Sequence, residues 1–338
     1  MLRFLSKSEA ATGGGATGEE SLNTQRCVSI RMNAAVGIIA SVAVFAAPEA
    51  VQAQAAIPGV VAAGQQPELV QEGFTFIEGP VGTRDGGLFF SDIRVGKTYR
   101  MDAGGKITVI REGTKSTNGL ALDKNGDLLG AEGDGGRISR RTADGTVTTV
   151  SGGYQGKPFL SPNDLIVDSK GGIYFTDPGP RPVVPGRPTY VFYLPAGAKD
   201  PVLVDGSIAR PNGLLLTKDE KTLIVDDTIG PTVFAFDIQP DGTLKNKHVF
   251  AQLHDTVQGQ ESGADGACID RNDRAYITTA SGVQIFDRNG QYLGTIKAAR
   301  QAANCAFAGP DKKTLYLTAR EGLYRLRTIA QGPDRLGK

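Results

Sequence analysis

The chain has 338 residues, with 37 Lys and Arg against 36 Asp and Glu and a formal charge of +1. This balance, without a run of basic residues, excludes the electrostatic footprint of a nucleic-acid-binding protein, so we expect no nucleic-acid partner. The length allows one large all-β domain or two ordinary domains. The 45 Gly, many of them in Asp-Gly, Asn-Gly and Gly-Gly pairs, indicate tight turns between short strands.

Residues 1–55 have the composition of an export signal. An Ala/Val/Ile-rich stretch over residues 32–56 follows two arginines and ends in Ala53-Gln54-Ala55, the order typical of a secretory leader with a small-residue cleavage site. A proline and a glutamate interrupt the apolar core, which makes it short for a membrane span. We expect a leader over 1–55 that is removed, a mature chain beginning near Ala56, and a periplasmic or extracellular protein with no stable membrane span. An uncleaved membrane anchor or a disordered tail is the alternative.

After the leader we expect a short linker over 56–66, one domain over 67–328 and a C-terminal tail over 329–338. Two cysteines, Cys268 and Cys305, fall in apolar strand sequences of this domain, which indicates buried thiols. An oxidising compartment would also allow a disulfide between them.

A short pattern recurs six times along this domain. It reads IEGPVGT at 77, TNGLALD at 117, SPNDLIVD at 161, RPNGLLLT at 210, ADGACID at 264 and ANCAFAG at 303. Alignment of the six copies brings one polar residue of each to a common position, with spacings of 39 to 53 residues: Glu78, Asn118, Asn163, Asn212, Asp265 and Asn304.

The second copy shows most clearly what each repeat contains. GLALD is followed by the turn KNGD, then by LLGAE, GRISRRT, the turn ADG and TVTTV, which predicts a four-stranded antiparallel meander. Such a unit repeating every 40 to 50 residues is the signature of a β-propeller blade. The last repeat has only three strands, and residues 67–77 alternate like a strand. We therefore predict an all-β, six-bladed β-propeller closed by an N-terminal strand in the last blade.

The aligned polar residues start the first strand of each repeat, and in a propeller this strand lines the central channel. They should form a ring at one end of the channel, made of one Glu, one Asp and four Asn. Carboxylate and amide oxygens are the ligands that a hard divalent cation prefers. Because the ring has no His or Cys, a closed zinc site with nitrogen or sulfur ligands is disfavoured. The ring therefore predicts a divalent-metal site.

Turn geometry is the alternative explanation of the ring, because Asn-Gly, Asn-Asp and Asp-Gly are common turn pairs. It accounts for Asn118 and Asn304, but poorly for Glu78, since Glu is not a turn former. A carboxylate in a narrow channel is also costly unless a positive charge meets it. We therefore favour the metal site.

The second strand of each repeat returns to the ring, so its last residues should form the mouth of the channel. These residues are Asp92, Glu132, Asp177 and Asp226, with Arg320 in the last repeat. We expect an acidic mouth in which Glu132 and Asp177 bind substrate hydroxyls. A Pro-rich loop over 178–188 follows, and it is either a lid or a surface loop without function.

With these motifs the chain resembles the regucalcin/gluconolactonase family of calcium-dependent lactonases with six-bladed propellers. The resemblance covers residues 67–328 and rests on EGP, SPNDL…YFTDP, RPNGL, ADGACID and NCAFAG…KTLYLTA in the family order. It implies metal ligands at Glu78, Asn163, Asn212 and Asp265, a water-activating role for Asp265, and a substrate contact at Asn118. The implied cation is Ca²⁺, with Zn²⁺, Mg²⁺ and Mn²⁺ as alternatives.

Several positions depart from the pattern of that family. Ser161 stands where animal members have an Arg, and Gly133 stands where many bacterial members have a His. Neither His248 nor His254 falls in register with the channel, which disfavours the organophosphate-hydrolysing relatives and a quinone-dependent sugar dehydrogenase. The resemblance therefore supports the metal chemistry more than the substrate contacts.

The predicted reaction is metal-assisted hydrolysis of a sugar lactone. The cation would polarise the ring carbonyl while Asp265 takes a proton from the attacking water. Asn118 and the acidic mouth would suit a neutral polyol ester. A hydrolase of another lactone or ester on the same site, and a non-catalytic calcium-binding propeller, are the alternatives. The sequence does not indicate an oligomeric state.

Overall fold

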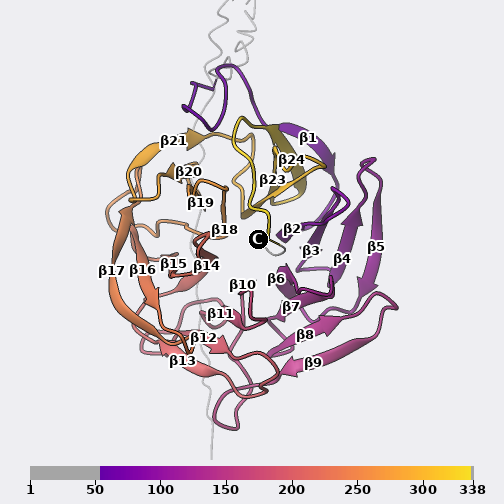
Figure 1. Cartoon of the computed structure of the whole chain (residues 1–338), viewed down its shortest axis with the longest axis vertical. Helices are drawn as coiled ribbons and strands as arrows, with labels where there is room; N and C mark the ends of the chain where they lie inside the picture. The colour runs from indigo at the N-terminus through magenta and orange to yellow at the C-terminus, as the bar shows by residue number, and fades with distance from the viewer. Residues whose placement is uncertain (1–53, 336–338) are drawn as a thin grey trace, which may run out of the picture. The chain divides into compact units, whose positions relative to one another are not determined.

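The structure is a computed structural model that describes residues 54–335. Over these residues it contains no α-helix, and 24 strands form six four-stranded antiparallel sheets. The sheets surround a common centre as the blades of a propeller, as Figure 1 shows. The prediction of an all-β, six-bladed propeller is confirmed.

Each blade runs from an innermost strand at the centre to an outer strand at the rim (Figure 1). The innermost strands are β2 (Ile77–Gly82), β6 (Thr117–Leu122), β10 (Leu165–Val167), β14 (Pro211–Leu216), β18 (Ala267–Ile269) and β22 (Asn304–Ala308). The second strands are β3 (Leu88–Asp92), β7 (Leu128–Glu132), β11 (Ile173–Asp177), β15 (Thr222–Asp227), β19 (Ala275–Thr279) and β23 (Thr314–Ala319). We number the blades 1 to 6 in this order.

The outer half of each blade is built in the same way. The third strands are β4 (Lys97–Met101), β8 (Arg137–Arg141), β12 (Tyr190–Leu194), β16 (Thr232–Ile238), β20 (Gly282–Phe286) and β24 (Gly322–Arg327). The outer strands are β5 (Ile107–Glu112), β9 (Val147–Ser151), β13 (Val202–Asp205), β17 (Leu244–Gln252), β21 (Tyr292–Ile296) and β1 (Glu68–Glu72).

The N-terminal strand closes the ring of blades. β1 pairs antiparallel with β24, with Glu68 opposite Arg325 and Glu72 opposite Gly322. The first strand of the propeller thus completes the sheet formed by its last three strands. Closure gives the outer edge of β24 a partner and joins the two ends of the domain. This confirms the predicted closure.

Asp residues shape the turns between the two innermost strands of several blades. Asp123 Oδ1 accepts hydrogen bonds from the backbone N–H groups of Asn125 and Asp127, at 2.8 and 3.0 Å. Asp168 and Asp270 make the same pair of bonds in blades 3 and 5. These bonds add to the backbone hydrogen bonds within the same turns and so stabilise the short loops.

The apolar core is divided into six clusters, and each cluster lies between two neighbouring blades. The cluster between blades 5 and 6 contains Cys268 and Cys305, which are both buried and whose sulfur atoms lie 2.9 Å apart. Burial of apolar surface between blades, rather than within a single sheet, therefore holds the ring together.

Residues 56–66, which we expected to act as a linker, pack against the propeller. Ile57, Val60 and Val61 are buried in the cluster between blades 5 and 6. The carbonyl of Val60 accepts hydrogen bonds from Ile329 N and Ala330 N, at 2.8 and 3.3 Å. The segment is therefore part of the fold, because its three apolar side chains are buried in the core between two blades.

The predicted leader lies almost entirely outside the described residues. No helix within residues 54–335 is both long enough and apolar enough to cross a membrane.

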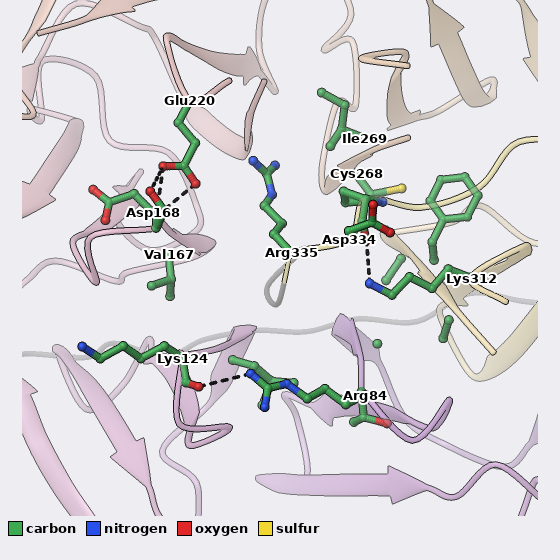
Figure 2. Close-up of a pocket in the computed structure, with 18 residues that line it drawn as sticks. Arg84, Lys124, Val167, Asp168, Glu220, Cys268, Ile269, Lys312, Asp334 and Arg335 are labelled. Atoms are coloured by element: carbon green, nitrogen blue, oxygen red, sulfur yellow. Dashed lines mark hydrogen bonds between the residues drawn. The ribbon is translucent and has the colours of Figure 1, made fainter. Parts of the chain in front are cut away.

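A cavity of about 450 Å³ lies where the innermost strands end, away from the aligned polar residues that begin them (Figure 2). The last described residues cross this end of the channel. Arg335 donates to the carbonyls of Leu216 and Thr217, and Lys312 Nζ donates to Pro333 O at 2.7 Å. Pro333 and Arg335 thus bind polar groups of blades 6 and 4 at this end of the channel.

Candidate active site

The aligned polar residues gather at the other end of the innermost strands. Glu78, Asn118, Asn212 and Asn304 lie in the innermost strands of their blades, whereas Asn163 and Asp265 lie two residues before theirs. All except Asn304 line one pocket of about 350 Å³. The four residues predicted as metal ligands are therefore brought together with Asn118, although they come from four different blades.

The glycine after several of these residues explains how the innermost strands approach one another. Gly119 N donates to Asn163 O, and Gly213 N donates to Asp265 O, both at 2.7 Å. A Cβ atom on either glycine would lie 2.4 Å from an oxygen of the next blade. The Asn-Gly pair at 118 is thus inside a strand and not in a turn, so the turn explanation is wrong for Asn118.

Two amide oxygens at the pocket are left without a partner. Asn212 Nδ2 donates to Asp265 Oδ1 at 2.9 Å and to Thr228 Oγ1 at 3.1 Å. Asn212 Oδ1 and Asn118 Oδ1 are buried and accept no hydrogen bond from residues 54–335. Because buried acceptors normally have a partner, these two oxygens are available to a bound cation or a substrate hydroxyl.

Carboxyl groups concentrate beneath the pocket. Burial raises the pKa of Asp265 to about 7, and the nearby Asp164 adds to the rise, while the Asn212 hydrogen bond and the charges of Arg320 and Arg181 oppose it. Burial, together with Asp265 and Asp164, also holds the pKa of Asp226 well above its usual range. A cation at this place would favour the charged carboxylates, so the donor set fits a divalent metal.

The acids expected at the mouth bind backbone groups instead. Asp92 accepts from Thr75 N and Phe76 N at 2.7 and 3.0 Å. Asp177 accepts from Leu160 N and Ser161 N, both at 2.7 Å. Each carboxylate holds the segment that enters the innermost strand of its own blade. Asp177 therefore does not line the pocket, in contrast to the expected contact with substrate.

Glu132 also lies away from the pocket lining. Its fully buried carboxylate accepts from Arg111 Nη2 and Arg137 Nε, each at 2.7 Å. Burial alone would raise the pKa of Glu132, but hydrogen bonds from Arg137 and Arg111 outweigh it and lower the pKa. Glu132 thus joins blades 1 and 2 through an ion-pair triad, which differs from the substrate contact that we expected.

Arginines line the pocket where acids were expected. Arg94, Arg181 and Arg210 all line it, and Arg181 comes from the Pro-rich loop over 178–188. Sequence reasoning missed all three. Arg210 had a signal, because it precedes Pro211-Asn212 in the RPNGL motif, whereas Arg94 and Arg181 lie in loops without a pattern.

Comparison with known proteins bears directly on this site. Residues 76–321 match the SMP-30/Gluconolactonase/LRE-like region, which is nearly all of the propeller. The chain belongs to this family. Its SMP-30/gluconolactonase relatives include a gluconolactonase of Zymomonas mobilis, 28% identical over 296 residues that cover 78% of this chain and 82% of the relative.

Solved structures agree with this membership of the SMP-30/gluconolactonase family. A gluconolactonase from Xanthomonas campestris is 32% identical with a TM-score of 0.70, and the match covers 78% of this chain and 90% of that one. Regucalcin from Agrobacterium tumefaciens, a calcium-binding protein, has a TM-score of 0.69 at 19% identity, covers 79% of this chain and 95% of that one, and shares the fold.

Gly133 and Ser161, the two positions that the sequence analysis set apart from the family pattern, both line the pocket.

Proposed function

We propose that this protein is a metal-dependent lactonase that opens a sugar lactone by attack of water. Similarity to gluconolactonases supports lactone hydrolysis. The observation that carries the metal dependence is the gathering of Glu78, Asn163, Asn212 and Asp265 in one pocket. Two carboxylates and two amides from four blades supply only oxygen donors, the ligand type that Ca²⁺ prefers. The orphaned Asn212 oxygen adds to this support.

In this proposal Glu78, Asn163, Asn212 and Asp265 hold the cation, with Ca²⁺ favoured and Zn²⁺, Mg²⁺ or Mn²⁺ as alternatives. When bound, a divalent cation would supply Lewis-acid polarisation of the lactone carbonyl and stabilise the developing oxyanion. Glu78 and Asn212 are only 2% and 5% exposed, so these two ligands have little contact with bulk water.

Asp265 is the proposed general base. Its carboxylate takes a proton from the attacking water, whose oxygen forms the new bond to the carbonyl carbon. The ring C–O bond then breaks, and the leaving ring oxygen takes the proton from Asp265 to become a hydroxyl group, so that the product is the open hydroxy acid. The Asn212 amide donates to Asp265 Oδ1 and so fixes the orientation of the base. Asn118, whose side-chain oxygen has no partner within residues 54–335, is placed to accept a hydrogen bond from a substrate hydroxyl.

The test is hydrolysis of glucono-1,5-lactone by protein that begins at Gln54, with and without a chelator. We expect turnover that is lost on chelation and restored by Ca²⁺. Turnover that does not respond to the chelator would contradict the metal dependence but not the lactonase activity. Calcium binding without turnover of any lactone or ester would point to the non-catalytic propeller, and a panel of other esters would reveal a different hydrolase.

We also propose that the protein is exported to the periplasm or the medium. The order of basic, apolar and small residues before Ala56 supports this proposal. Mass spectrometry of the protein from its native host should find an N-terminus close to Ala56. Peptides from residues 1–50 in the soluble protein would contradict export with cleavage.

A further inference from the structure

The wall of the pocket carries an excess of guanidinium groups. Three arginines line it, Arg94, Arg181 and Arg210, whereas its only carboxylates are those of Glu78 and Asp265. The two carboxylates lie at the floor, on or next to the innermost strands. The three arginines lie in the loops that connect β3 to β4, β11 to β12 and β13 to β14.

Arg210 is a buried charge without a counter-ion. Its side chain is 6% exposed, and its guanidinium donates only to the carbonyls of Pro178 and Gly179, both at 3.2 Å. Its Nε is buried without a partner, and no carboxylate within residues 54–335 lies at ion-pair distance. Burial lowers the pKa of Arg210 and the neighbouring charge of Arg181 lowers it further, while the charges of Glu261 and Asp265 oppose this shift without cancelling it. Two guanidinium groups therefore repel each other here.

Arg181 has one counter-ion, and it is well exposed to solvent. Its two terminal nitrogens donate to Glu261 Oε1 and Oε2 at 3.1 and 2.8 Å. The two side chains are 50% and 43% exposed, so water screens this pair and its contribution is small. Glu261 can therefore offset little of the charge on Arg210.

Arg94 contacts an aromatic ring rather than an acid. Its guanidinium carbon lies 5.3 Å from the centre of the Phe76 ring, and that of Arg320 lies 4.8 Å from the same centre. Among the residues that the structure describes, neither arginine has a carboxylate at ion-pair distance, and Arg320 donates to Gln301 Oε1 instead. A ring face offsets little of a cation's charge at an exposed site, so Arg94, which lines the pocket, remains available to an anion.

These contacts leave guanidinium groups at the pocket once a divalent cation has offset the charges of Glu78 and Asp265, the two carboxylates that line it. Within residues 54–335, Arg181 has Glu261 at ion-pair distance, whereas Arg94 and Arg210 have no carboxylate at that distance. We propose that the substrate is a lactone with an anionic substituent, a carboxylate or a phosphate, which binds to Arg181 and Arg210. Guanidinium groups bind both anions through paired hydrogen bonds. This inference rests on the proposed lactonase function and specifies its substrate class.

The test compares lactones in matched pairs that differ in charge but not in ring size. Glucaro-1,4-lactone, with a free carboxylate, is compared with glucono-1,4-lactone, and 6-phosphoglucono-1,5-lactone with glucono-1,5-lactone. We expect kcat/KM to favour at least one anionic member by about tenfold or more, which corresponds to about 1.4 kcal/mol. The pair in which the anionic lactone is favoured shows whether the site binds a carboxylate or a phosphate. Added salt should reduce the preference, because it screens exposed charges.

Variants show where the preference arises. Arg181→Gln should bring the anionic-to-neutral ratio of kcat/KM towards unity, mainly through the KM of the anionic lactone. The control is Arg84→Gln, which removes the same charge from an exposed arginine at the opposite end of the channel (Figure 2). It should leave the ratio unchanged, so any effect of overall charge is excluded.

Two results would overturn the inference and are distinguishable. If neutral lactones are hydrolysed as well as their anionic partners, and Arg181→Gln does not change the ratio, the inference is wrong while the lactonase function stands. If no lactone of either kind is hydrolysed by metal-loaded protein, the proposed function is wrong and the inference fails with it.

Discussion

Asn212 Nδ2 donates a hydrogen bond of 2.9 Å to Asp265 Oδ1 and so links blade 4 to blade 5 at the floor of the pocket. The bond turns one carboxylate oxygen towards the amide. It also leaves Asn212 Oδ1 as a buried acceptor without a partner in residues 54–335. A proposed ligand and the proposed base therefore orient each other, although 53 residues separate them in the chain.

Replacement of Asp265 by Asn tests the proposed base and ligand together. Asp265→Asn keeps the size of the side chain but removes its charge and its ability to take a proton. Loss of a proton-transfer group typically costs about 10²- to 10⁴-fold in rate, and a weaker metal site would add to this loss. Lactone turnover and calorimetric titration with Ca²⁺ measure the two effects.

Asp226→Asn is the matched control for that variant. Burial favours the protonated form of Asp226 and raises its pKa well above its usual range. The amide resembles the protonated acid and still offers an oxygen to Gly213 N, which donates to Asp226 at 3.1 Å. Calcium affinity should therefore change far less than in Asp265→Asn. An equal loss in both variants would place Asp226 among the ligands.

The stability of the metal-free protein should fall as the pH rises towards neutrality. Burial raises the pKa of Asp265 to about 7, so the folded protein holds a proton between about pH 4 and 7 that the unfolded chain has already lost. The folded state binds more protons in this window, and stability therefore decreases with increasing pH. Thermal unfolding in EDTA should give a lower melting temperature at pH 8 than at pH 5.5.

Added Ca²⁺ should reverse this trend, because it binds the charged carboxylate and stabilises the folded protein more at pH 8 than at pH 5.5. The Asp265→Asn variant should show a smaller fall in melting temperature with pH. A melting temperature that rises steadily from pH 5.5 to 8 in EDTA would contradict the proposed protonation of Asp265.

Glu132→Gln should reduce stability with little effect on turnover. The change leaves Arg111 and Arg137 without their shared buried carboxylate, and loss of one partner of a buried polar contact costs about 1–3 kcal/mol. Urea unfolding gives this cost, and kcat/KM should stay near the wild-type value. Glu112→Gln, at an ion pair that is 68% exposed on the glutamate side, should cost much less. A large fall in kcat/KM with unchanged stability would restore Glu132 as a substrate contact.

Protein that begins at Pro67 should melt at a lower temperature than protein that begins at Gln54. The shorter form lacks Ile57, Val60 and Val61, whose side chains are at most 3% exposed. Burial of one such side chain contributes about 1.5–3 kcal/mol. Protein that begins at Ala56 keeps these three side chains and loses the Gln54 contacts with Thr295, Lys297 and Gly64, so it should differ less. Equal melting of all three forms would show that the segment adds no stability.

Local patterns in the sequence were sufficient for the fold and for the ring of polar residues. A strand, a turn and a second strand lie within about 15 residues of each other, so alternating apolar residues and Asn-Gly or Asp-Gly turns predict each blade without long-range information. Six copies of one unit then place Glu78, Asn163, Asn212 and Asp265 at the same end of the channel. The missing strand of the last repeat even predicted the closure by β1.

Only the tertiary structure shows which charged side chains line the pocket. Asp177 and Glu132 end second strands, as predicted. However, Asp177 accepts hydrogen bonds from backbone groups of a neighbouring loop, and Glu132 pairs with two arginines from two blades. Arg94, Arg181 and Arg210 meet at the mouth from loops of three blades. A buried carboxylate accepts hydrogen bonds from donors close to it, and the packing of the blades determines which donors are close. Strand patterns therefore predict the position of a charged residue along its strand, whereas the packing of the blades determines what its side chain binds.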